Sequence, residues 1–339
     1  MSYRVAINGF GRIGRNYLRC LLDRGLLGTS VEVVAINDLW EPATLANLLA
    51  SDSTFGKLRW DVTHDAAGLV VDGHAIPTYR EGDPAVLPWT KHGVDLVIES
   101  TGKLRARDDA AKHLKAGAGR VLLSAPGKEV DATIVLGVNH DTYDPIRHQI
   151  VSAASCTTNC AAPMVKVIDD AFGIVHGYLT TVHAYTNDQV LLDSPHKDPR
   201  RGRSAAVNII PTSTGAAKAI GLVIPTVQGR LDGVALRVPV ENGSLTDLTC
   251  QLREAATAAD INAAFAAAAA ASGPLAGILR YTEAPVVSRD IVGDPASCVF
   301  DAGLTQATDR LVKIFGWYDN EWGYASRLVE LTELFATHD

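Results

Sequence analysis

The chain has 339 residues, of which 47% are hydrophobic and 20% are charged. That composition is typical of a folded globular protein, and at roughly 100–200 residues per domain the length predicts two domains. The 31 Lys and Arg residues against 38 Asp and Glu residues give a net charge of −7. This charge excludes nucleic acid as the main partner, because binding to its backbone needs clustered positive charge.

The cysteines and apolar segments argue against a disulfide scaffold, a metal site and a membrane span. The five cysteines include no CxxC pair and no spacing typical of zinc ligands, so we expect reduced thiols, no bound metal and a cytoplasmic location. The N-terminus has no signal-peptide core. The longest apolar stretch, residues 263–271, is too short to cross a bilayer and predicts an alanine-rich helix.

The first part of the chain, up to about residue 155, alternates strands and helices. Its apolar runs predict strands at 4–8, 31–38, 69–71, 96–100, 120–124, 132–135 and 149–152, with helices near 16–22 and 108–116. This order is typical of an α/β fold with a Rossmann-type, doubly wound parallel sheet covered by helices on both faces.

The pattern changes after about residue 155. Segments such as 246–252 alternate apolar and polar residues, which predicts an α+β domain with a mostly antiparallel sheet. A polar loop spans 188–203, and a loop of this length is usually functional or part of an interface. Within it, Arg201 and Arg203 are candidates for an anion contact or, with greater weight, a subunit interface.

A glycine motif follows the first predicted strand. Gly9, Gly11 and Gly14 form G-x-G-x-x-G between a strand and a helix. In a dinucleotide site such glycines allow the tight turn, the close approach of a pyrophosphate and close helix packing. Asp38 ends the next strand, where an acid binds the ribose hydroxyls and repels a 2′-phosphate. The motif therefore predicts binding of NAD in preference to NADP.

A second candidate site centres on a cysteine at the start of a predicted helix. Cys156 lies between a strand and helix-like residues, and Ser155, Thr157 and Thr158 surround it with hydroxyls. A helix N-terminus stabilises a thiolate. His183 lies in an apolar strand segment and alone is most often structural, but beside a candidate nucleophile it becomes a candidate base. Such a base is expected to lower the pKa of the thiol.

Together these features resemble the glyceraldehyde-3-phosphate dehydrogenase family. The matching stretches run in family order over essentially the whole chain: INGFGRIGR at 7–15, ESTG at 99–102, SAP at 124–126, SCTTNCAAP at 155–163, HAYTNDQ at 183–189, PTSTGAAKAIG at 211–221, LRVPV at 236–240 and GWYDNEWGYASR at 316–327. The resemblance implies NAD-dependent oxidation of glyceraldehyde 3-phosphate to 1,3-bisphosphoglycerate, with inorganic phosphate as co-substrate. It also implies a thioester on Cys156, with His183 as base, and a homotetramer.

The resemblance also assigns binding residues and domains. Besides the glycines and Asp38, it places Arg12, Ile13, Arg80, Ser124, Asn320 and Tyr324 at the cofactor. It places Thr186 and Arg237 at the substrate phosphate, and Ser155, Thr157, Thr214 and Gly215 at inorganic phosphate. The implied domains are an NAD-binding domain of residues 1–155 and 320–339 around an inserted catalytic domain of residues 156–319, because the last helix, from about Glu321, returns to the first domain.

The chain departs from the family pattern around the cysteine and in the long loop. Ala153 stands where Asn is usual, Ala161 replaces a larger aliphatic residue, and Ser194 replaces a leucine. These changes remove no catalytic group. The change at 194 is able to relax the preference for NAD, and the smaller residues near Cys156 raise the hypothesis of an inhibitor-tolerant paralogue.

Two other functions stay open. One is erythrose-4-phosphate dehydrogenase, which shares the cysteine, histidine and NAD fold but releases an acid by hydrolysis. The other is a non-catalytic NAD-binding protein with a second role, against which the intact Cys156, His183 and Arg237 weigh.

Overall fold

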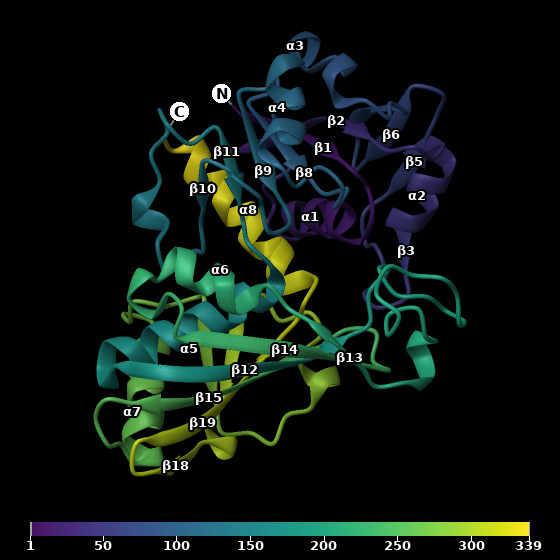
Figure 1. The fold of residues 1–339 in the computed structure, drawn as a ribbon. Helices are drawn as coiled ribbons and strands as arrows, with labels where there is room; N and C mark the ends of the chain where they lie inside the picture. Colours follow the sequence, from purple (N-terminus) through teal and green to yellow (C-terminus); the bar gives the residue numbers. More distant parts are fainter. Residues whose placement is uncertain (1, 339) are drawn as a thin grey trace. The chain divides into compact units, whose positions relative to one another are not determined.

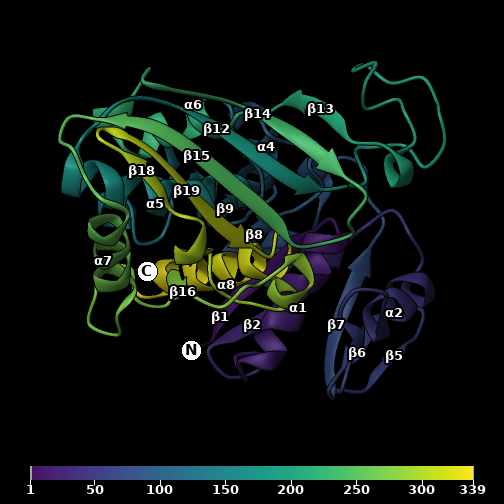
Figure 2. The same cartoon turned by 90° about the horizontal axis from the view of Figure 1, so that it is seen from below.

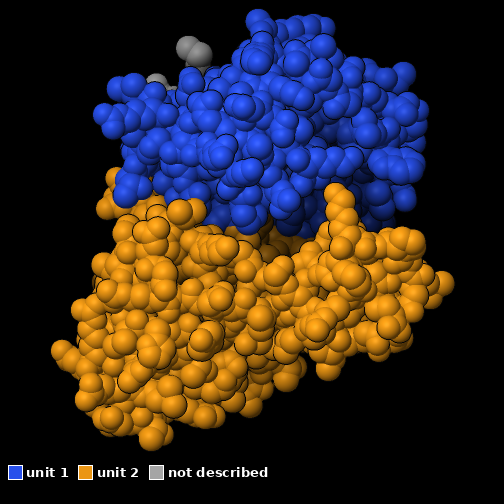
Figure 3. All heavy atoms as spheres, viewed as in Figure 1, with its two compact units in different colours: residues 1–134, 142–154, 325–339 blue, residues 135–141, 155–324 orange. Residues whose placement is uncertain are grey.

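The computed structural model describes residues 2–338 and divides the chain into two compact units, coloured in Figure 3. Unit 1 comprises residues 1–134, 142–154 and 325–339, and unit 2 comprises residues 135–141 and 155–324. Met1 and Asp339, the outer limits of the predicted first domain, lie outside the described residues. The functional domains stay a prediction: an NAD-binding domain of residues 1–155 with 320–339, and a catalytic domain of residues 156–319.

Unit 1 is built on a nine-stranded sheet with the strand order β10-β11-β9-β8-β1-β2-β7-β6-β5 (Figure 1). In chain order its strands are β1 (Tyr3–Asn8), β2 (Val31–Asn37), β5 (Val62–His64), β6 (Gly68–Val71), β7 (His74–Tyr79), β8 (Leu96–Glu99), β9 (Arg120–Leu123), β10 (Ala132–Thr133) and β11 (Ile150–Ser152). The helices of this part of the chain are α1 (Arg12–Asp23), α2 (Pro42–Ala50), α3 (Trp89–His92), α4 (Arg107–Lys115) and α8 (Trp322–Ala336), and a small ribbon pairs β3 (Ser51–Asp52) with β4 (Gly56–Lys57).

The central strands are parallel and buried on both faces, as the near-continuous apolar runs predict. Strand β1 pairs in parallel with β2 and β8, and five of its six residues are buried. The packing of α1 and α8 includes a hydrogen bond of 2.9 Å between the hydroxyls of Tyr17 and Thr332. The predicted doubly wound fold is confirmed for these strands.

One edge of this sheet differs from the prediction. The run at 69–71 forms part of β6, which pairs antiparallel with both β5 and β7. The cause is the turn Asp72-Gly73, in which both residues have positive φ angles, 49° and 77°. A two-residue turn of this kind reverses the chain into a hairpin, so β6 cannot continue the parallel order.

Unit 2 is built on a second sheet with the order β13-β14-β12-β15-β19-β17-β16, and β18 pairs with β19 (Figure 2). Its strands are β12 (Ile174–Ala184), β13 (Ile210–Ser213), β14 (Leu231–Val238), β15 (Ser244–Leu252), β16 (Leu279–Thr282), β17 (Cys298–Asp301), β18 (Gln306–Thr308) and β19 (Leu311–Tyr318). Its helices are α5 (Cys156–Phe172), α6 (Ala216–Val223) and α7 (Ala258–Ala269). Short 3₁₀ helices in the chain span Pro84–Val86, His140–Thr142, Ala205–Val207, Pro225–Val227, Ser288–Ile291 and Ala302–Leu304.

The second sheet is mostly antiparallel, as predicted. Only β12 with β14 and β16 with β17 are parallel pairs among the described strands of this sheet. Every second residue of β15 is buried, and α5 packs on β15, β17 and β19. Side chains on this sheet include the exposed Tyr178 and Val234. The alanine-rich helix expected near 263–271 is α7, which Thr257 and Asp260 begin with reciprocal hydrogen bonds.

Among residues 2–338, no helix combines the length and the apolar character needed to cross a membrane.

Candidate active site

The glycine motif forms the turn from β1 into α1. Gly9 has a φ angle of +91°, and a Cβ there would lie 2.7 Å from the backbone nitrogen of Thr101. A Cβ on Gly14 would lie 2.2 Å from the carbonyl oxygen of Gly9. A Cβ on Gly11, in contrast, would meet nothing within 4 Å, and no side chain caps the N-terminus of α1. Space and backbone donors for a pyrophosphate are therefore available at Gly11.

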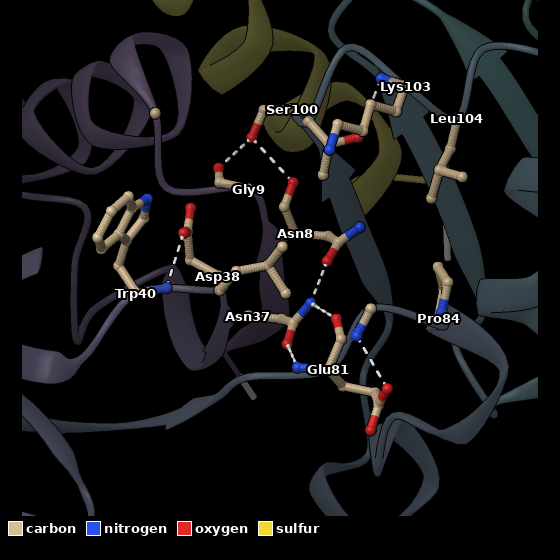
Figure 4. A pocket seen from close by; sticks show the side chains of 14 residues that line it. Asn8, Gly9, Asn37, Asp38, Trp40, Glu81, Pro84, Ser100, Lys103 and Leu104 are labelled. Carbon is tan, nitrogen blue, oxygen red and sulfur yellow. Dashed lines mark hydrogen bonds between the residues drawn. The ribbon is translucent and has the colours of Figure 1, made fainter.

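A cavity of about 310 Å³ lies in unit 1 beside this turn (Figure 4). Gly9, Gly11 and Asp38 line it, as the motif predicts. The carboxylate of Asp38 accepts hydrogen bonds from the backbone N–H groups of Phe10 (2.7 Å) and Trp40 (3.3 Å). These bonds hold a negative charge at the wall of the cavity, and the donors, open space and acid together fit a dinucleotide with a free ribose 2′-hydroxyl.

The other lining residues were not predicted to bind the cofactor. They are Asn8, Asn37, Leu39, Trp40, Glu81, Gly82, Pro84, Ser100, Thr101, Lys103 and Leu104. Several of them follow the carboxyl ends of β1, β2 and β8, where ligands of doubly wound sheets bind. The ends of these predicted strands could therefore have indicated the position of the cavity from the sequence.

A network of buried polar side chains forms the floor of this cavity. Asn37 donates a 2.7 Å hydrogen bond to the side-chain oxygen of Asn8, and Asn8 donates a 2.6 Å bond to Glu99. The other neighbours of Glu99 include the ring of His113, at 3.0 Å, and the backbone N–H of Thr101, at 2.9 Å. Because buried polar groups are costly unless bonded, this network fixes the position of the cavity floor.

Seven of the ten predicted cofactor residues are not among those that line the cavity: Arg12, Ile13, Gly14, Arg80, Ser124, Asn320 and Tyr324. Among the described contacts, the guanidinium of Arg12 pairs with Asp52 and that of Arg80 pairs with Glu41. Ile13 is half-buried in the first turn of α1, and the backbone N–H of Ser124 bonds to Glu99. Their roles at a cofactor stay predictions.

Cys156 and His183 come together in unit 2. Cys156 is the first residue of α5, where the Ser155 hydroxyl accepts a hydrogen bond of 3.0 Å from the backbone N–H of Thr158. The preceding residue, Ala154, has a φ angle of +57°, a strained conformation that is uncommon outside glycine. The Cys156 sulfur lies 3.4 Å from Nε2 of His183, which is near the end of β12.

Burial opposes ionisation of either partner alone. It raises the pKa of the Cys156 thiol to about 11, although Arg237 and the Thr157 N–H act to lower it. Burial, together with the charge of Arg237, lowers the pKa of His183 to about 3. Burial thus outweighs the groups that lower the thiol pKa, and the expected effect of His183 on that pKa stays a prediction. Between those values the pair exchanges no net proton with solvent, so ionisation requires a proton transfer from sulfur to nitrogen.

Arg237 is the cation of this site. It is the parallel register partner of His183, on β14 beside β12. Its Nη1 lies 2.9 Å from His183 Nδ1, 3.1 Å from the Ala184 carbonyl oxygen and 3.4 Å from the Thr186 hydroxyl. Its Nε is buried without a partner, and no described carboxylate forms an ion pair with the guanidinium. A half-buried guanidinium without a carboxylate partner is suited to binding an anion.

The residues predicted for inorganic phosphate lie at the starts of two helices, α5 and α6. Ser155 caps α5, and Gly215 caps α6, where the hydroxyl of Thr214 accepts from the Ala216 N–H at 3.2 Å. The buried Thr157 lies with its hydroxyl 2.8 Å from that of Tyr318.

Tyr318 was missed by sequence reasoning. Its hydroxyl also bonds to Thr181 at 2.8 Å, and its ring lies edge-on to that of His183 at 6.0 Å. Because Thr157 and Tyr318 are 161 positions apart in the chain, no local pattern pointed to this contact. Through these two hydrogen bonds Tyr318 links the strand that carries His183 to the helix that begins with Cys156.

Asn320 and Tyr324 are both buried. The side-chain oxygen of Asn320 accepts a 2.8 Å hydrogen bond from the hydroxyl of Ser244. Burial raises the pKa of the Tyr324 phenol, with the nearby Cys156 sulfur adding to the effect. The side chain of Asn320 is thus held in place, while the contact of either residue with a nicotinamide stays a prediction.

The long loop carries its own ion pairs. Arg201 pairs with Asp188 and donates a 2.9 Å bond to Thr212, and Arg203 pairs with Asp193 at 2.8 Å. Leu191 and Leu192, in the same loop, are 77% and 74% exposed. Both arginines thus form ion pairs with carboxylates, in contrast to Arg237.

Two family models match this chain. The model described as the NAD binding domain of glyceraldehyde 3-phosphate dehydrogenase matches residues 3–107, and the one described as its C-terminal domain matches residues 155–320. The first match confirms the predicted cofactor, NAD.

Curated relatives agree with the family models. The chain is 56% identical over 333 residues to glyceraldehyde-3-phosphate dehydrogenase 2 of Streptomyces avermitilis, covering 98% of each protein. It is 57% identical over 333 residues to glyceraldehyde-3-phosphate dehydrogenase of Streptomyces coelicolor and 57% identical over 338 residues to that of Mycobacterium tuberculosis, again covering 98% of each protein. The chain therefore belongs to the glyceraldehyde-3-phosphate dehydrogenase family.

Proposed function

We propose that this protein is an NAD-dependent, phosphorylating aldehyde dehydrogenase that converts glyceraldehyde 3-phosphate and inorganic phosphate to 1,3-bisphosphoglycerate. The observation that carries the proposal is the group of Cys156, His183 and Arg237. A sulfur nucleophile lies 3.4 Å from a ring nitrogen able to take its proton, and the same ring lies 2.9 Å from an arginine without a carboxylate partner. A nucleophile, a base and an anion-binding cation are what oxidation of a phosphorylated aldehyde through a thioester requires.

The residues of the chain take the following parts. Nε2 of His183 accepts the proton of the Cys156 thiol as the sulfur attacks the aldehyde carbon, giving a thiohemiacetal. The protonated ring then donates to the oxyanion, together with the backbone N–H of Cys156 at the start of α5. Bound NAD supplies the hydride acceptor, and the product on sulfur is a thioester. Inorganic phosphate attacks this thioester and releases the acyl phosphate, because a thioester keeps its carbonyl reactive.

Two anion subsites follow from the same geometry and the family resemblance. Arg237 and the hydroxyl of Thr186, which are in contact at 3.4 Å, bind the phosphate of the aldehyde. Ser155, Thr157, Thr214 and Gly215 form the subsite for inorganic phosphate. Helix starts support this assignment, since Ser155 and Gly215 are the N-cap residues of α5 and α6.

The cofactor site follows from unit 1. Gly9, Gly11 and Gly14, with Arg12 and Ile13 in the first turn of α1, receive the pyrophosphate, and Asp38 receives the ribose hydroxyls. The family resemblance also assigns Arg80 and Ser124 to the cofactor, and it assigns Asn320 and Tyr324, which belong to unit 2, to the nicotinamide. The fixed carboxylate of Asp38 supports NAD over NADP through its charge.

Steady-state kinetics test the proposal directly. Formation of NADH from glyceraldehyde 3-phosphate is expected to depend on inorganic phosphate and to disappear in Cys156→Ser, while Cys20→Ser, which changes a buried thiol of unit 1, keeps the activity. NADH formation without any dependence on phosphate would contradict the phosphorylating reaction. Full activity of Cys156→Ser would overturn the assignment of the nucleophile.

The same assay separates the alternatives. A higher kcat/KM with erythrose 4-phosphate and release of a free acid identifies erythrose-4-phosphate dehydrogenase. Binding of NAD without turnover of either aldehyde identifies a non-catalytic protein. The inhibitor-tolerant paralogue stays a hypothesis on Ala153 and Ala161, both fully buried; inactivation by an epoxide at the rate found for an ordinary relative would refute it.

We further propose a homotetramer in the cytoplasm. The apolar side chains of Tyr178 and Val234 on the second sheet, and of Leu191, Leu192 and Val207 in and after the long loop, are 50–77% exposed. Large apolar side chains that are exposed in a single subunit are often covered at interfaces between subunits. Sedimentation analysis at micromolar concentration tests the assembly, and a monomer would refute it.

A further inference from the structure

A carboxylate is buried behind the wall of the cofactor cavity in unit 1, and the mechanism proposed above gives it no part. Glu99 is the last residue of β8 and is 3% exposed. Asn8 and Thr101 line the cavity. The side-chain amide of Asn8 donates to the Glu99 carboxylate at 2.6 Å, and the backbone N–H of Thr101 donates to it at 2.9 Å. Glu99 therefore contacts the cavity wall from behind.

The histidine beside this carboxylate is neutral. The indole N–H of Trp89 donates a 2.9 Å hydrogen bond to Nδ1 of His113, which must hold a lone pair because an indole nitrogen has only a proton to offer. The single proton of the ring is therefore on Nε2, which lies 3.0 Å from the carboxylate of Glu99 and donates to it. A cationic ring would place a second proton between Nδ1 and the indole, so His113 is no counter-charge for Glu99.

The other end of this network is fixed by the backbone. The side-chain oxygen of Asn37 accepts from the Glu81 backbone N–H at 2.9 Å, and its amide nitrogen donates to the Glu81 carbonyl oxygen at 2.9 Å. In that orientation Asn37 donates to the side-chain oxygen of Asn8 at 2.7 Å (Figure 4). The amide nitrogen of Asn8 is then the donor to Glu99. Both ends of the network thus direct protons toward Glu99, which suits an ionised carboxylate and not a neutral amide.

Glu99 therefore carries a negative charge without a cation beside it. Among residues 2–338, the one ion-pair contact of its carboxylate is with the ring of His113, and that ring is neutral. Hydrogen bonds stabilise a buried charge but do not cancel it. Its field reaches the cavity, because a charge in the protein interior is screened much less than a charge in water.

The strand order indicates which half of a dinucleotide this charge faces. In the sheet, β1 lies between β2 and β8. Asp38, expected at the adenosine ribose, follows β2, and the glycine turn, expected at the pyrophosphate, follows β1. In a doubly wound fold the two nucleotides bind on opposite sides of this turn, so we expect the second one over the end of β8. That half carries the nicotinamide, whose ring is a cation in NAD⁺ and neutral in NADH.

We propose that Glu99 is a specificity-determining residue for the oxidised cofactor: its buried charge stabilises the cationic ring of NAD⁺ relative to the neutral ring of NADH. This inference rests on the proposed cofactor site in unit 1. Glu99 acts through its charge, across Asn8 and Thr101, and needs no contact with the cofactor. A dehydrogenase that oxidises aldehydes takes up NAD⁺ and releases NADH in every turnover, and this charge favours both steps.

Dissociation constants of the full-length protein for NAD⁺ and NADH, measured by calorimetry without any aldehyde, test the proposal. Glu99→Gln removes the charge and keeps the length of the side chain. The Kd for NADH divided by the Kd for NAD⁺ should fall about three- to tenfold, the size of a unit-charge interaction across a layer of side chains at the effective dielectric constant of a protein. An unchanged ratio in folded Glu99→Gln would overturn the proposal.

Two control variants separate the charge from the hydrogen bonds. Glu99→Asp keeps the charge but shortens the side chain, so both dissociation constants should rise by the same factor and their ratio should stay. Glu81→Gln removes an exposed carboxylate at the same cavity, where solvent screens it, and should also leave the ratio unchanged. A purely structural Glu99 would make the Gln variant behave like the Asp variant, with both affinities lowered together. An equal fall of the ratio in Glu81→Gln would contradict a special role of Glu99.

A measurement on the wild type covers the case in which Glu99→Gln does not fold. Benzamide adenine dinucleotide replaces the charged nicotinamide with a neutral ring of the same shape. It should bind the wild type about three- to tenfold more weakly than NAD⁺, for the same electrostatic reason, and equal or tighter binding would refute the proposal. Failure of the wild type to bind either NAD⁺ or NADH would instead refute the proposed cofactor site, so the two failures are distinguishable.

Discussion

The glycine turn of unit 1 offers a matched pair of substitutions with opposite expected effects. Gly14→Ala places a methyl group 2.2 Å from the carbonyl oxygen of Gly9 and 3.1 Å from side-chain atoms of Ile7 and Ser100. Gly11→Ala places the same group where nothing lies within 4 Å. The first change therefore tests packing inside the protein, and the second tests the approach of the cofactor.

The magnitude for Gly14→Ala follows from the contact. An ordinary carbon contact needs at least 3.4 Å, so α1 has to move by about 1 Å away from a backbone oxygen that cannot yield like a flexible side chain. Overpacking of this kind costs about 1–3 kcal/mol. At about 2–4 °C for each kcal/mol in a unit of this size, the melting temperature should fall by roughly 2–12 °C. Binding of NAD should weaken as well, because the shift displaces the start of α1.

For Gly11→Ala we expect a protein of nearly unchanged stability. Residue 11 has a φ angle of −73°, which alanine adopts freely, and loss of glycine at an N-cap costs no more than about 1 kcal/mol. The methyl group would instead occupy the space left for the pyrophosphate. Losing one hydrogen bond to a charged phosphate costs about 1.5–3 kcal/mol, so the Kd for NAD should rise roughly 10–100-fold.

Differential scanning calorimetry and a fluorescence titration with NAD measure the two effects independently. We expect a lower melting temperature only for Gly14→Ala and weaker binding of NAD for both variants. A Gly11→Ala variant that binds NAD as tightly as the wild type would refute the close approach of the phosphates. An unchanged melting temperature of Gly14→Ala would refute the packing argument.

Three further substitutions test the two sites, and a fourth tests the stability of the fold. His183→Asn should lower kcat by roughly 10²–10⁴-fold, the usual contribution of a general base; retention of a tenth of the activity would exclude that role. Arg237→Leu should raise the KM for glyceraldehyde 3-phosphate about tenfold or more and leave that for unphosphorylated glyceraldehyde nearly unchanged, and equal increases would argue against a phosphate contact. Asp38→Ser should reduce the preference for NAD over NADP, measured as kcat/KM, by about tenfold, because a like charge near the 2′-phosphate is removed; an unaltered ratio would contradict this. Burial acts to raise the pKa of Asp52, but bonds from Arg12 and backbone N–H groups outweigh it and lower the pKa. A carboxylate with a depressed pKa stabilises the fold above its unfolded pKa of about 3.9 and loses that effect as the pH falls through the folded value, so the stability gap between wild type and Asp52→Asn should be present at pH 7 and shrink below about pH 4; a gap that grows on acidification would reverse the sign.

The sequence by itself determined the parts of the protein that depend on local chemistry. The turn at Gly9, Gly11 and Gly14 was predictable because a positive φ angle strains most other residues and no Cβ fits within 3 Å of a backbone atom. The start of α5 at Cys156 was predictable because Ser155 is a good N-cap. The antiparallel pairing of β6 also had a local signal, the turn at Asp72-Gly73. The apolar run at 69–71 was nevertheless interpreted as a strand of the parallel sheet.

Tertiary structure alone decided the state of the candidate active site. The contact of His183 with Arg237 depends on the register of β12 against β14, and that of Thr157 with Tyr318 joins residues 161 positions apart. Desolvation, which raises the thiol pKa, comes from the whole surrounding interior. A sequence specifies which groups are present, whereas pairing, burial and the position of a proton depend on distances that only the folded chain sets.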